Sequence, residues 1–427
     1  MKRVAWTFVQ LLLSVTLARA SEPTPEPGAS APRLTEAELL VHLVDGGDDP
    51  RLRVFAARIA HARAQVVGAG VLANPTLAYE REELFPDRGS VSENTIKLAW
   101  PIDISGRRGR RIAAAEADVA ATHAEVASAR NAIVLDALAL FDEAVYQRLR
   151  VAEWSAARDV LAELVAVVAK RVTRGETASY DLQRLALELA AHDDALAGAQ
   201  LERDTAQRRL AILVGDDGGR RDAAGTLGLP PDSLAGGWDA WIGAEHPDVK
   251  AATSRKRAAA AALGAARRGW VPDLVIDAGL KTAEGIEGSS LGYVAGISVA
   301  LPLFDRAQGD EARARAASAE AEAQLQVLAA RLGPLAQTAA EVLAARILRA
   351  ERFAVEQTER LPALLRAARA AYHEGDRPIG ELIEVHRTAR DVALRALDLR
   401  MEARASELDL WRTLGRRLRT DREGANP

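Results

Sequence analysis

Residues 291–310, LGYVAGISVALPLFDRAQGD, change from a strand pattern to a helix pattern within one short stretch. Up to Leu301, large apolar residues alternate with small ones, which predicts a β-strand with one large apolar face. Such alternation is typical of a strand that crosses a membrane. After Pro302 the alternation stops, and roughly 70 residues rich in Ala, Leu, Glu and Arg precede Gly375. At about 1.5 Å per residue, they predict a helix of about 100 Å that begins directly after a strand.

Composition and charge narrow the class of protein. Of the 427 residues 48% are hydrophobic but only 4% are aromatic, which favours long, closely packed helices over a thick globular core. The formal net charge of -4 gives no support to a nucleic-acid partner. We interpret the basic cluster GRRGRR at 106–111 as a solvated loop or helix start. The absence of Cys excludes a disulfide framework and a lipid-modified N-terminal Cys.

The first 20 residues have the pattern of a secretory signal peptide. Lys2 and Arg3 precede an apolar run, and Ala18-Arg19-Ala20 forms a cleavage site. We therefore expect residues 1–20 to be removed and the mature chain to start with an extended, Pro-rich leader over 21–34. No later stretch has 18 consecutive apolar residues, so we expect any membrane crossing to be made by strands of a closed barrel.

Two similar blocks of elements follow the leader. The first repeat, 35–237, opens with a helix in which Thr35 and Glu38 form a capping-box pattern. Its further elements are predicted as a helix from Pro50, strands over about 76–84 and 93–100, a long helix over about 107–174, a return helix over about 177–214 and a connector over 215–237. The elements of the second repeat, 238–416, are predicted as strands over about 273–281 and 291–301, a long helix over about 305–374 and a return helix over about 378–414, before a polar tail at 417–427.

Pro and Gly residues recur at matching places in the two repeats. Counterparts lie 197, 197, 201, 200 and 200 residues apart, and the pairs are Pro50 and Pro247, Pro75 and Pro272, Pro101 and Pro302, Gly175 and Gly375, and Gly215 and Gly415. Five ordered pairs with nearly one spacing indicate an internal duplication. In the first long helix a coiled-coil seam with 4-3-4 spacing consists of Leu161, Val165, Val168 and Val172. The simplest packing stacks the two shorter helices of each repeat end to end beside the long one.

The four predicted strands of about 9 to 11 residues are long enough to cross an outer membrane. The prolines before the first and after the second strand of each repeat place all helices on one side of the sheet. Four strands cannot close a barrel, so this interpretation requires oligomerisation: a dimer would supply eight strands and a trimer twelve. The alternative is a four-stranded sheet in a soluble α+β protein.

Five motifs carry a resemblance to a known family. They are ANP before the first strand, WPIDISGRRGRR, LPLFDRAQG, and the helical turns RGETASYDLQ and YHEGDRPIGELIE. In this order, and with the duplicated spacing, they resemble the TolC family of outer-membrane efflux proteins, in particular its heavy-metal and drug efflux branch. The resemblance implies an α+β membrane protein whose homotrimer forms a twelve-stranded barrel and an α-helical tunnel through the periplasm. It also implies a passive outer-membrane exit duct, coupled to an inner-membrane pump through a periplasmic adaptor.

The resemblance also assigns roles to residues at two helical turns. Arg377 corresponds to the family's gating arginine, while Glu381 and Glu384 correspond to its acidic aperture pair, with Glu where Asp is more usual. Asp181 follows its own turn with the same spacing as Glu381. Three copies would place six carboxylates of Glu381 and Glu384 around one axis, and such a ring favours cations. Helix capping alone is the alternative role of these acids.

The same turns are expected to be the tips that contact the adaptor. The tip residues are Arg174, Gly175, Gly375 and Asp376. Both glycines are expected at positive φ, as is common at helix ends. Arg171 is expected to take part in this contact as well, and a solvated basic helix end is the alternative interpretation of Arg171 and Arg174.

Three prolines are given structural roles. Pro101 and Pro302 are predicted to end the second strand of each repeat and to mark the junction between barrel and tunnel. Pro362 is predicted to lie inside the second long helix and to kink it, at a cost of about 3 kcal/mol. The kink is interpreted either as a bend that narrows the tunnel or as a tolerated irregularity.

We predict no enzyme. The seven His show no HExxH or other ligand spacing, and neither a nucleophile elbow nor a P-loop is present. We therefore expect no catalytic residue, no metal site and no cofactor. A competing hypothesis is a soluble periplasmic coiled-coil scaffold or adaptor. An adaptor usually has one hairpin flanked by compact β-domains, whereas this chain is predicted to have two hairpins and short paired strands.

Overall fold

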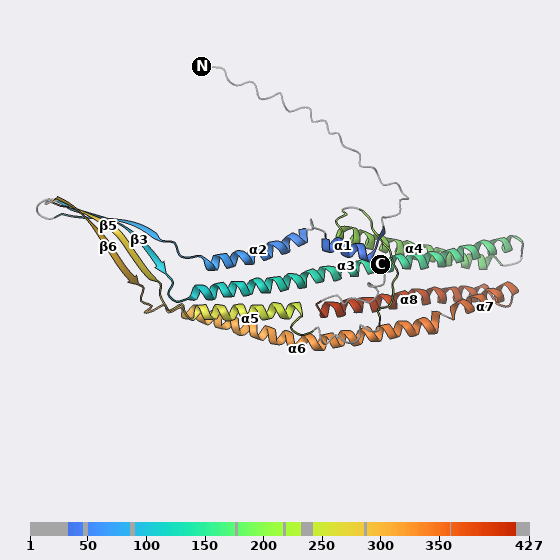
Figure 1. Ribbon diagram of the computed structural model, residues 1–427. Coiled ribbons are helices and arrows are strands. Elements are labelled where there is room, and N and C mark those ends of the chain that lie inside the picture. Colours follow the sequence, from blue (N-terminus) through green and yellow to red (C-terminus); the bar gives the residue numbers. More distant parts are fainter. Residues whose placement is uncertain are drawn as a thin grey trace, which may run out of the picture.

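The computed structural model describes residues 33–45, 50–85, 90–175, 178–216, 219–231, 242–285, 288–358 and 360–415. The predicted signal peptide and polar tail lie outside these residues, as does all of the leader except its last two residues. The molecule is elongated, with one sheet at one end and helices running side by side away from it (Figure 1). All helices therefore lie on one side of the sheet, as the prolines predicted.

The elements of the first half are β1 (Arg33–Leu34), α1 (Glu36–Asp45), α2 (Pro50–Gly70), β2 (Thr76–Leu84), β3 (Val91–Ile102), α3 (Arg107–Thr173), α4 (Ser179–Leu213) and β4 (Asp222–Ala223). The elements of the second half are α5 (Pro247–Ala266), β5 (Leu274–Gly285), β6 (Gly288–Val299), α6 (Gln308–Phe353), the π-helical segment η3 (Ala354–Thr358), α7 (Leu361–Glu374) and α8 (Ile379–Thr413). The short strands β1 and β4 pair in parallel, so the end of the leader is tied to the connector that follows α4.

The capping box at the start of α1 is confirmed. Glu38 Oε2 accepts hydrogen bonds from the Thr35 backbone N–H at 2.8 Å and from Thr35 Oγ1 at 2.9 Å. In return, the backbone N–H of Glu38 donates to Thr35 Oγ1 at 3.2 Å. These bonds satisfy N–H groups that have no partner within the helix.

The four long strands form one antiparallel sheet in the order β2-β3-β5-β6. Residues directly opposite one another share a face, so the register gathers one apolar face from all four strands. Its members include Leu77, Tyr79, Ile96, Leu98, Trp100, Ile276, Leu280, Tyr293 and Ile297. This face is open to solvent in the single chain: Tyr293 is 85% exposed and Ile297 72% exposed.

The other face of the sheet carries charged and small residues. Lys97 Nζ lies 2.5 Å from Glu80 Oε1, and Lys281 pairs with Glu93. Gly279 lies on this face, where a Cβ would lie 2.2 Å from the Ile96 carbonyl oxygen of β3. Only a residue without a side chain fits this close approach between β3 and β5.

The short helices of each half stack end to end beside the long one, as predicted. Helices α2 and α4 contact α3, while α5 and α8 contact α6 (Figure 1). The two junctions use related contacts: Arg51 Nη2 at the start of α2 donates to the Leu213 carbonyl oxygen of α4 at 3.2 Å, and His246 Nε2 lies 3.1 Å from the Thr413 carbonyl oxygen of α8. Leu213 and Thr413 are 200 residues apart, which agrees with the predicted duplication.

The second long helix is not continuous, and the prediction for Pro362 is wrong. Helix α6 ends at Phe353, the π-helical segment η3 follows, and α7 begins at Leu361. Pro362 therefore lies in the first turn of α7, where a backbone N–H would have no partner within the helix. The proline inside a helix is Pro334 of α6, which the sequence interpretation did not single out.

Pro101 does not end β3, contrary to the prediction. The strand continues through Pro101 to Ile102, opposite Val275 and Leu274 of β5. Strand β2 has already ended, because its last pair is Thr76 with Ala99. One edge of β3 is therefore open at this point, which is where a sheet tolerates a residue without an N–H. Pro302 does follow its strand, since β6 ends at Val299.

Of the helices that the structure describes, none combines the length and apolar character needed to cross a membrane.

Replacing Pro362 with Ala is expected to change the thermal unfolding midpoint only slightly, because Pro is well suited to a first helical turn. The matched control is Pro334→Ala, which removes a proline from the interior of α6 and should stabilise the protein by up to about 3 kcal/mol. Far-UV circular dichroism on heating measures both changes. An equally large gain in the two variants would contradict the position of Pro362 at the start of α7.

Candidate functional site at the hairpin tips

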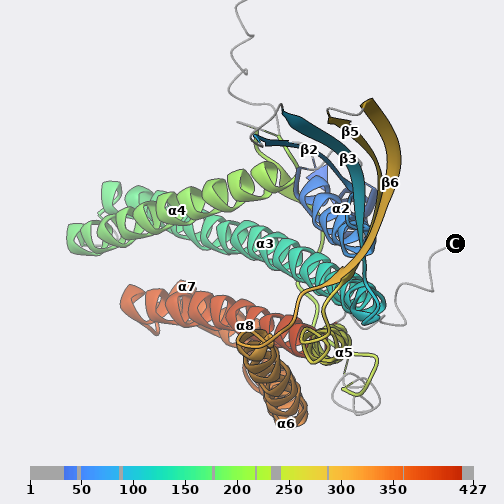
Figure 2. The ribbon, with the colours of Figure 1, turned by 90° about the vertical axis from the view of Figure 1, so that its left-hand side faces the viewer.

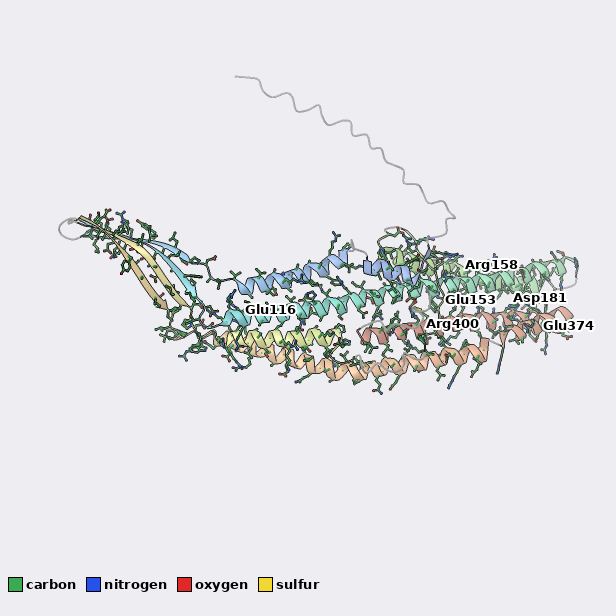
Figure 3. The ribbon with its side chains drawn as sticks, viewed as in Figure 1. Glu116, Glu153, Arg158, Asp181, Glu374 and Arg400 are labelled. Atoms are coloured by element: carbon green, nitrogen blue, oxygen red, sulfur yellow. The ribbon has the colours of Figure 1, made fainter. Side chains whose placement is uncertain are left out.

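Two helical turns form the end of the molecule opposite the sheet. Gly175 follows α3 with φ 74°, and Gly375 follows α7 with φ 81°, so both glycines have the predicted positive φ. After α7, the N–H of Gly375 donates to the Tyr372 carbonyl oxygen at 3.2 Å, and the N–H of Asp376 donates to Ala371 at 2.9 Å. These bonds close the end of the helix. Asp181 and Glu374 both lie at this end (Figure 3).

The predicted aperture residues of α8 are exposed and paired with arginines. Arg377 Nη1 lies 3.1 Å from Glu381 Oε1, and these side chains are 61% and 52% exposed. Glu384 is 71% exposed, and its Oε2 lies 3.8 Å from Arg387 Nη1. Ion pairs as exposed as these contribute little to stability. Their carboxylates are accessible to ions in solution.

The structure does not gather all predicted site residues at one point in the single chain. Arg377 and Glu381 contact each other, and Glu384 follows three residues later on α8. Asp181 lies in the first turn of α4, on the other hairpin. The tip residues Arg174 and Asp376 are exposed. The predicted roles of the aperture and of the tips remain proposals.

The two hairpins are joined behind their tips by an apolar seam. Its buried residues are Leu161, Val168, Leu185, Tyr372, Ile379, Leu382 and Ile383, with Val165 and Val172 packed against them. The coiled-coil positions predicted in α3 therefore do face a partner. The guanidinium of Arg171 lies 5.4 Å from the centre of the Tyr372 ring and adds a cation–π contact across the same seam.

An ion pair between a buried carboxylate and a half-exposed arginine extends this seam and was not predicted. Arg387 of α8 binds Glu188 of α4 in a bidentate pair, with a distance of 2.8 Å between Arg387 Nε and Glu188 Oε1. Glu188 is only 9% exposed. The hydrogen bonds from Arg387 hold the pKa of the Glu188 carboxyl below its ordinary value of 4.5. The pair therefore joins the two hairpins, and the charge of the Glu188 carboxylate depends on Arg387 to compensate for its burial.

His192 and Arg390 continue the same contact. Arg390 Nη1 donates to His192 Nε2 at 2.8 Å, so the proton of the neutral ring is on Nδ1, which donates to the Glu188 carbonyl oxygen at 3.0 Å. The Arg390 guanidinium also lies 4.8 Å from the centre of the Trp154 ring. In the described part of the chain, no group of three His, Asp or Glu side chains is arranged to hold a metal ion.

One signal in the sequence could have revealed this pair. The buried positions of α4 include Leu185, Glu188, His192, Ala199 and Ala206, which follow the spacing of a coiled-coil seam. A charged residue at a seam position is buried and requires a partner on the facing helix. The sequence does not identify Arg387 as that partner, because the facing register depends on how the two hairpins pack.

Glu188→Gln should lower the free energy of unfolding by about 1–2 kcal/mol at neutral pH, because it removes the charge-assisted hydrogen bonds between Glu188 and the half-exposed Arg387. Folding lowers the pKa of Glu188, so the wild-type contribution is complete above pH 4.5 and is lost as the pH falls through the folded-state pKa. Denaturant unfolding at several pH values measures the difference between wild type and variant. Glu381→Gln, which affects an exposed pair on the hairpin that carries Arg387, is the control and should change stability little. A difference that does not shrink on acidification would contradict the assignment.

Three comparisons with known proteins agree with this architecture. Residues 242–416 match the family model described as "Outer membrane efflux protein". The cobalt-zinc-cadmium resistance protein CzcC of Cupriavidus metallidurans is 26% identical over 66% of this chain and 66% of its own length. The nickel and cobalt resistance protein CnrC of the same organism is 28% identical over 69% of this chain and 68% of its own length. The matched region thus spans about two thirds of these relatives.

The fold is that of solved outer-membrane channels. The Campylobacter jejuni CmeC outer membrane channel superposes with a TM-score of 0.73 at 14% identity, over 91% of this chain and 88% of the channel. The family model matches the second of two related halves, and the structural likeness extends over both. Residues 242–416 are thus similar to the outer membrane efflux protein family, and the fold of the chain is shared with solved outer-membrane channels.

Proposed function

We propose that three copies of the chain form the outer-membrane exit duct of a tripartite efflux system and conduct cargo passively to the cell exterior. The observation that carries this proposal is the sheet: four long strands with one apolar, exposed face, and with β2 and β6 as open edges (Figure 2). Open edges present unpaired backbone groups that favour pairing with another strand.

Closure of the sheet requires further copies of the chain. The strands have 9, 12, 12 and 12 residues, lengths that suit a crossing of the outer membrane. Pairing of β6 in one copy with β2 of the next would give a twelve-stranded barrel in a trimer. The apolar face would then contact lipid, and the face with Lys97 and Glu80 would line the lumen.

The helices would continue this barrel as a tunnel in the periplasm. Helix α3 alone has 67 residues, which corresponds to about 100 Å. Pro101 and Pro302 lie where strands give way to helices in each half, so we assign the junction between barrel and tunnel to these positions. The direct join from strand to helix suits a wall that passes from a barrel to a tunnel.

At the far end we assign the aperture to Glu381 and Glu384, with Arg377 and Asp181 beside it. Three copies would contribute six carboxylates from α8, and their exposure in the single chain supports contact with passing ions. We assign the contact with a periplasmic adaptor to the tip residues Arg174, Gly175, Gly375 and Asp376. That adaptor would couple the duct to an inner-membrane pump. The names of the relatives favour divalent metal cations as cargo.

Cell fractionation tests the duct. The mature protein is expected in the outer membrane, soluble only with detergent, with a mass near three times that of one chain after cross-linking. A monomer in the soluble periplasmic fraction would overturn the proposal in favour of a scaffold or adaptor.

Conductance in planar bilayers tests the aperture. The double variant Glu381→Gln with Glu384→Gln should weaken block by divalent cations, because it removes six carboxylates from the assembled ring. Glu374→Gln, which removes one exposed acid per chain at the end of α7, is the control and should leave the block unchanged. Normal block in the double variant would show that these residues do not form the aperture, without contradicting the proposed duct.

A further inference from the structure

The helices form a layer that has two edges. Near the sheet, α2 contacts α3, α3 contacts α5 and α5 contacts α6, while nearer the hairpin tips α4 contacts α3, α3 contacts α8 and α8 contacts α6. Helices α2 and α4 therefore lie at one edge of the layer and α6 lies at the other (Figure 2). The sheet has the same order, with β2 and β6 at its edges.

Helix α4, at the first edge, is apolar on two opposite faces. Its exposed residues Leu187, Leu201 and Ile212 are 14 and 11 residues apart, close to whole numbers of helical turns, so they share one face. The buried residues Leu185 and Leu210 lie on the opposite side. Leu187 is 75% exposed, so this second apolar face is uncovered in the single chain. A helix with two apolar faces is expected to have a neighbour on each.

Helix α6, at the second edge, has the same property. Leu343 and Ile347 belong to its buried face, which packs against α8. Val327, Ala345 and Leu348 lie on the opposite face and are exposed. Each edge of the layer thus presents an apolar face that no other described element of the same chain covers.

Two contacts within the chain fix the relative heights of α4 and α6 along the layer. Arg387 of α8 binds Glu188 of α4, and Arg346 Nη1 of α6 donates to the Glu402 carbonyl oxygen of α8 at 3.0 Å. Helices α4 and α8 both run from the hairpin tips toward the middle of the molecule (Figure 1). The residue 15 positions after Glu188 on α4 therefore lies at the height of Arg346.

Three positions on each edge match at these heights. From the tips toward the middle, an acid, a leucine and a base follow one another on α4, and a base, a leucine and an acid follow one another on α6. The two exposed sets are Asp194, Leu201 and Arg208, and Arg352, Leu348 and Glu341. At about 1.5 Å per residue, each member lies within about 5 Å in height of its counterpart. The two edges are therefore complementary in both apolar character and charge.

The edges also match nearer the sheet. Lys256 Nζ of α5 lies 2.8 Å from Glu322 Oε1 of α6. Ile59 of α2 is the counterpart of Lys256 at the spacing of 197 residues between the two halves. Two exposed alanines, Ala57 of α2 and Ala323 of α6, therefore lie within about 2 Å in height of each other.

We propose that these edge faces are the surfaces through which copies of this chain bind one another, with α2 and α4 of one copy packed against α6 of the next. Leu201 then contacts Leu348 of the neighbouring copy, and Arg208 pairs with Glu341. Rotation about the axis of a closed ring does not shift a copy along that axis, so heights that match within one chain also match between neighbours.

A second copy is the occupant because the two edges complement each other and because the open strands β2 and β6 lie at the same two edges. The inference rests on the proposed ring of three chains. It goes beyond that ring by naming the helical contact and the axial register that would close the tunnel wall.

Cysteine cross-linking tests the proposal, and the chain has no Cys of its own. The mature full-length protein with Leu201→Cys and Leu348→Cys should form covalent dimers and trimers on mild oxidation in native outer membranes, resolved on a denaturing gel. In one chain the two positions lie on opposite edges of the layer, so the disulfide must join copies. Ala57→Cys with Ala323→Cys should give the same products.

The exchanged pairs are the matched controls, because they use the same four positions. Leu201→Cys with Ala323→Cys and Ala57→Cys with Leu348→Cys combine the same faces at heights that differ by more than about 35 Å, so they should not cross-link. Arg208→Glu should lower the yield of the cross-link between positions 201 and 348 about fivefold, and Glu341→Arg in the same chain should restore it.

Cross-linking of the exchanged pairs, or no cross-link between positions 201 and 348, would overturn the contact. The mass of the unoxidised protein separates this outcome from failure of the duct. A species near three times the mass of one chain without the disulfide would refute the contact alone, whereas a monomer would refute both the contact and the duct.

Discussion

The packing of α3 against helices from both halves is the constraint on which the rest of the structure depends. This one helix contacts α2 and α4 of its own half and α5 and α8 of the other. A helix of 67 residues has too little apolar surface of its own to be stable in isolation, so its length is useful only where neighbours cover it along the whole axis. End-to-end stacking of the shorter helices supplies that cover. It also fixes the distance between the sheet and the hairpin tips.

Buried charges then give this packing its specificity. An apolar seam of Leu, Val and Ala tolerates shifts along the helix axis, because one small apolar contact resembles the next. The pairing of Glu188 with Arg387 disfavours such a shift, since a one-turn displacement would leave the buried Glu188 carboxylate without its partner. Arg404 has the same effect nearer the middle of the helices, where it joins α8 to Asp142 of α3 and Glu36 of α1. The two charge clusters thus fix how the halves of the chain align.

Much of this fold could be predicted, because it follows from short-range patterns. Alternation in 291–301 and its partner strands indicated the sheet, and the spacing of Pro and Gly indicated two related halves. The positive φ of Gly175 and Gly375 and the capping box of Thr35 and Glu38 also depend only on near neighbours in the chain. Pro362 was misjudged because a helix break at Phe353 leaves no clear mark in an alanine-rich sequence.

The sequence by itself therefore determined the four long strands, most of the helices, their order and the turn residues, since each depends on contacts within a few positions. Only the tertiary structure decided which distant side chains meet. Glu188 and Arg387 are 199 residues apart, and Asp142 and Arg404 are 262 apart. Such partners are set by the axial register of packed helices, to which local patterns contribute nothing. For the same reason the sequence indicated Glu381 and Glu384 through resemblance, whereas the partners of Glu188 and Asp142 became visible only in three dimensions.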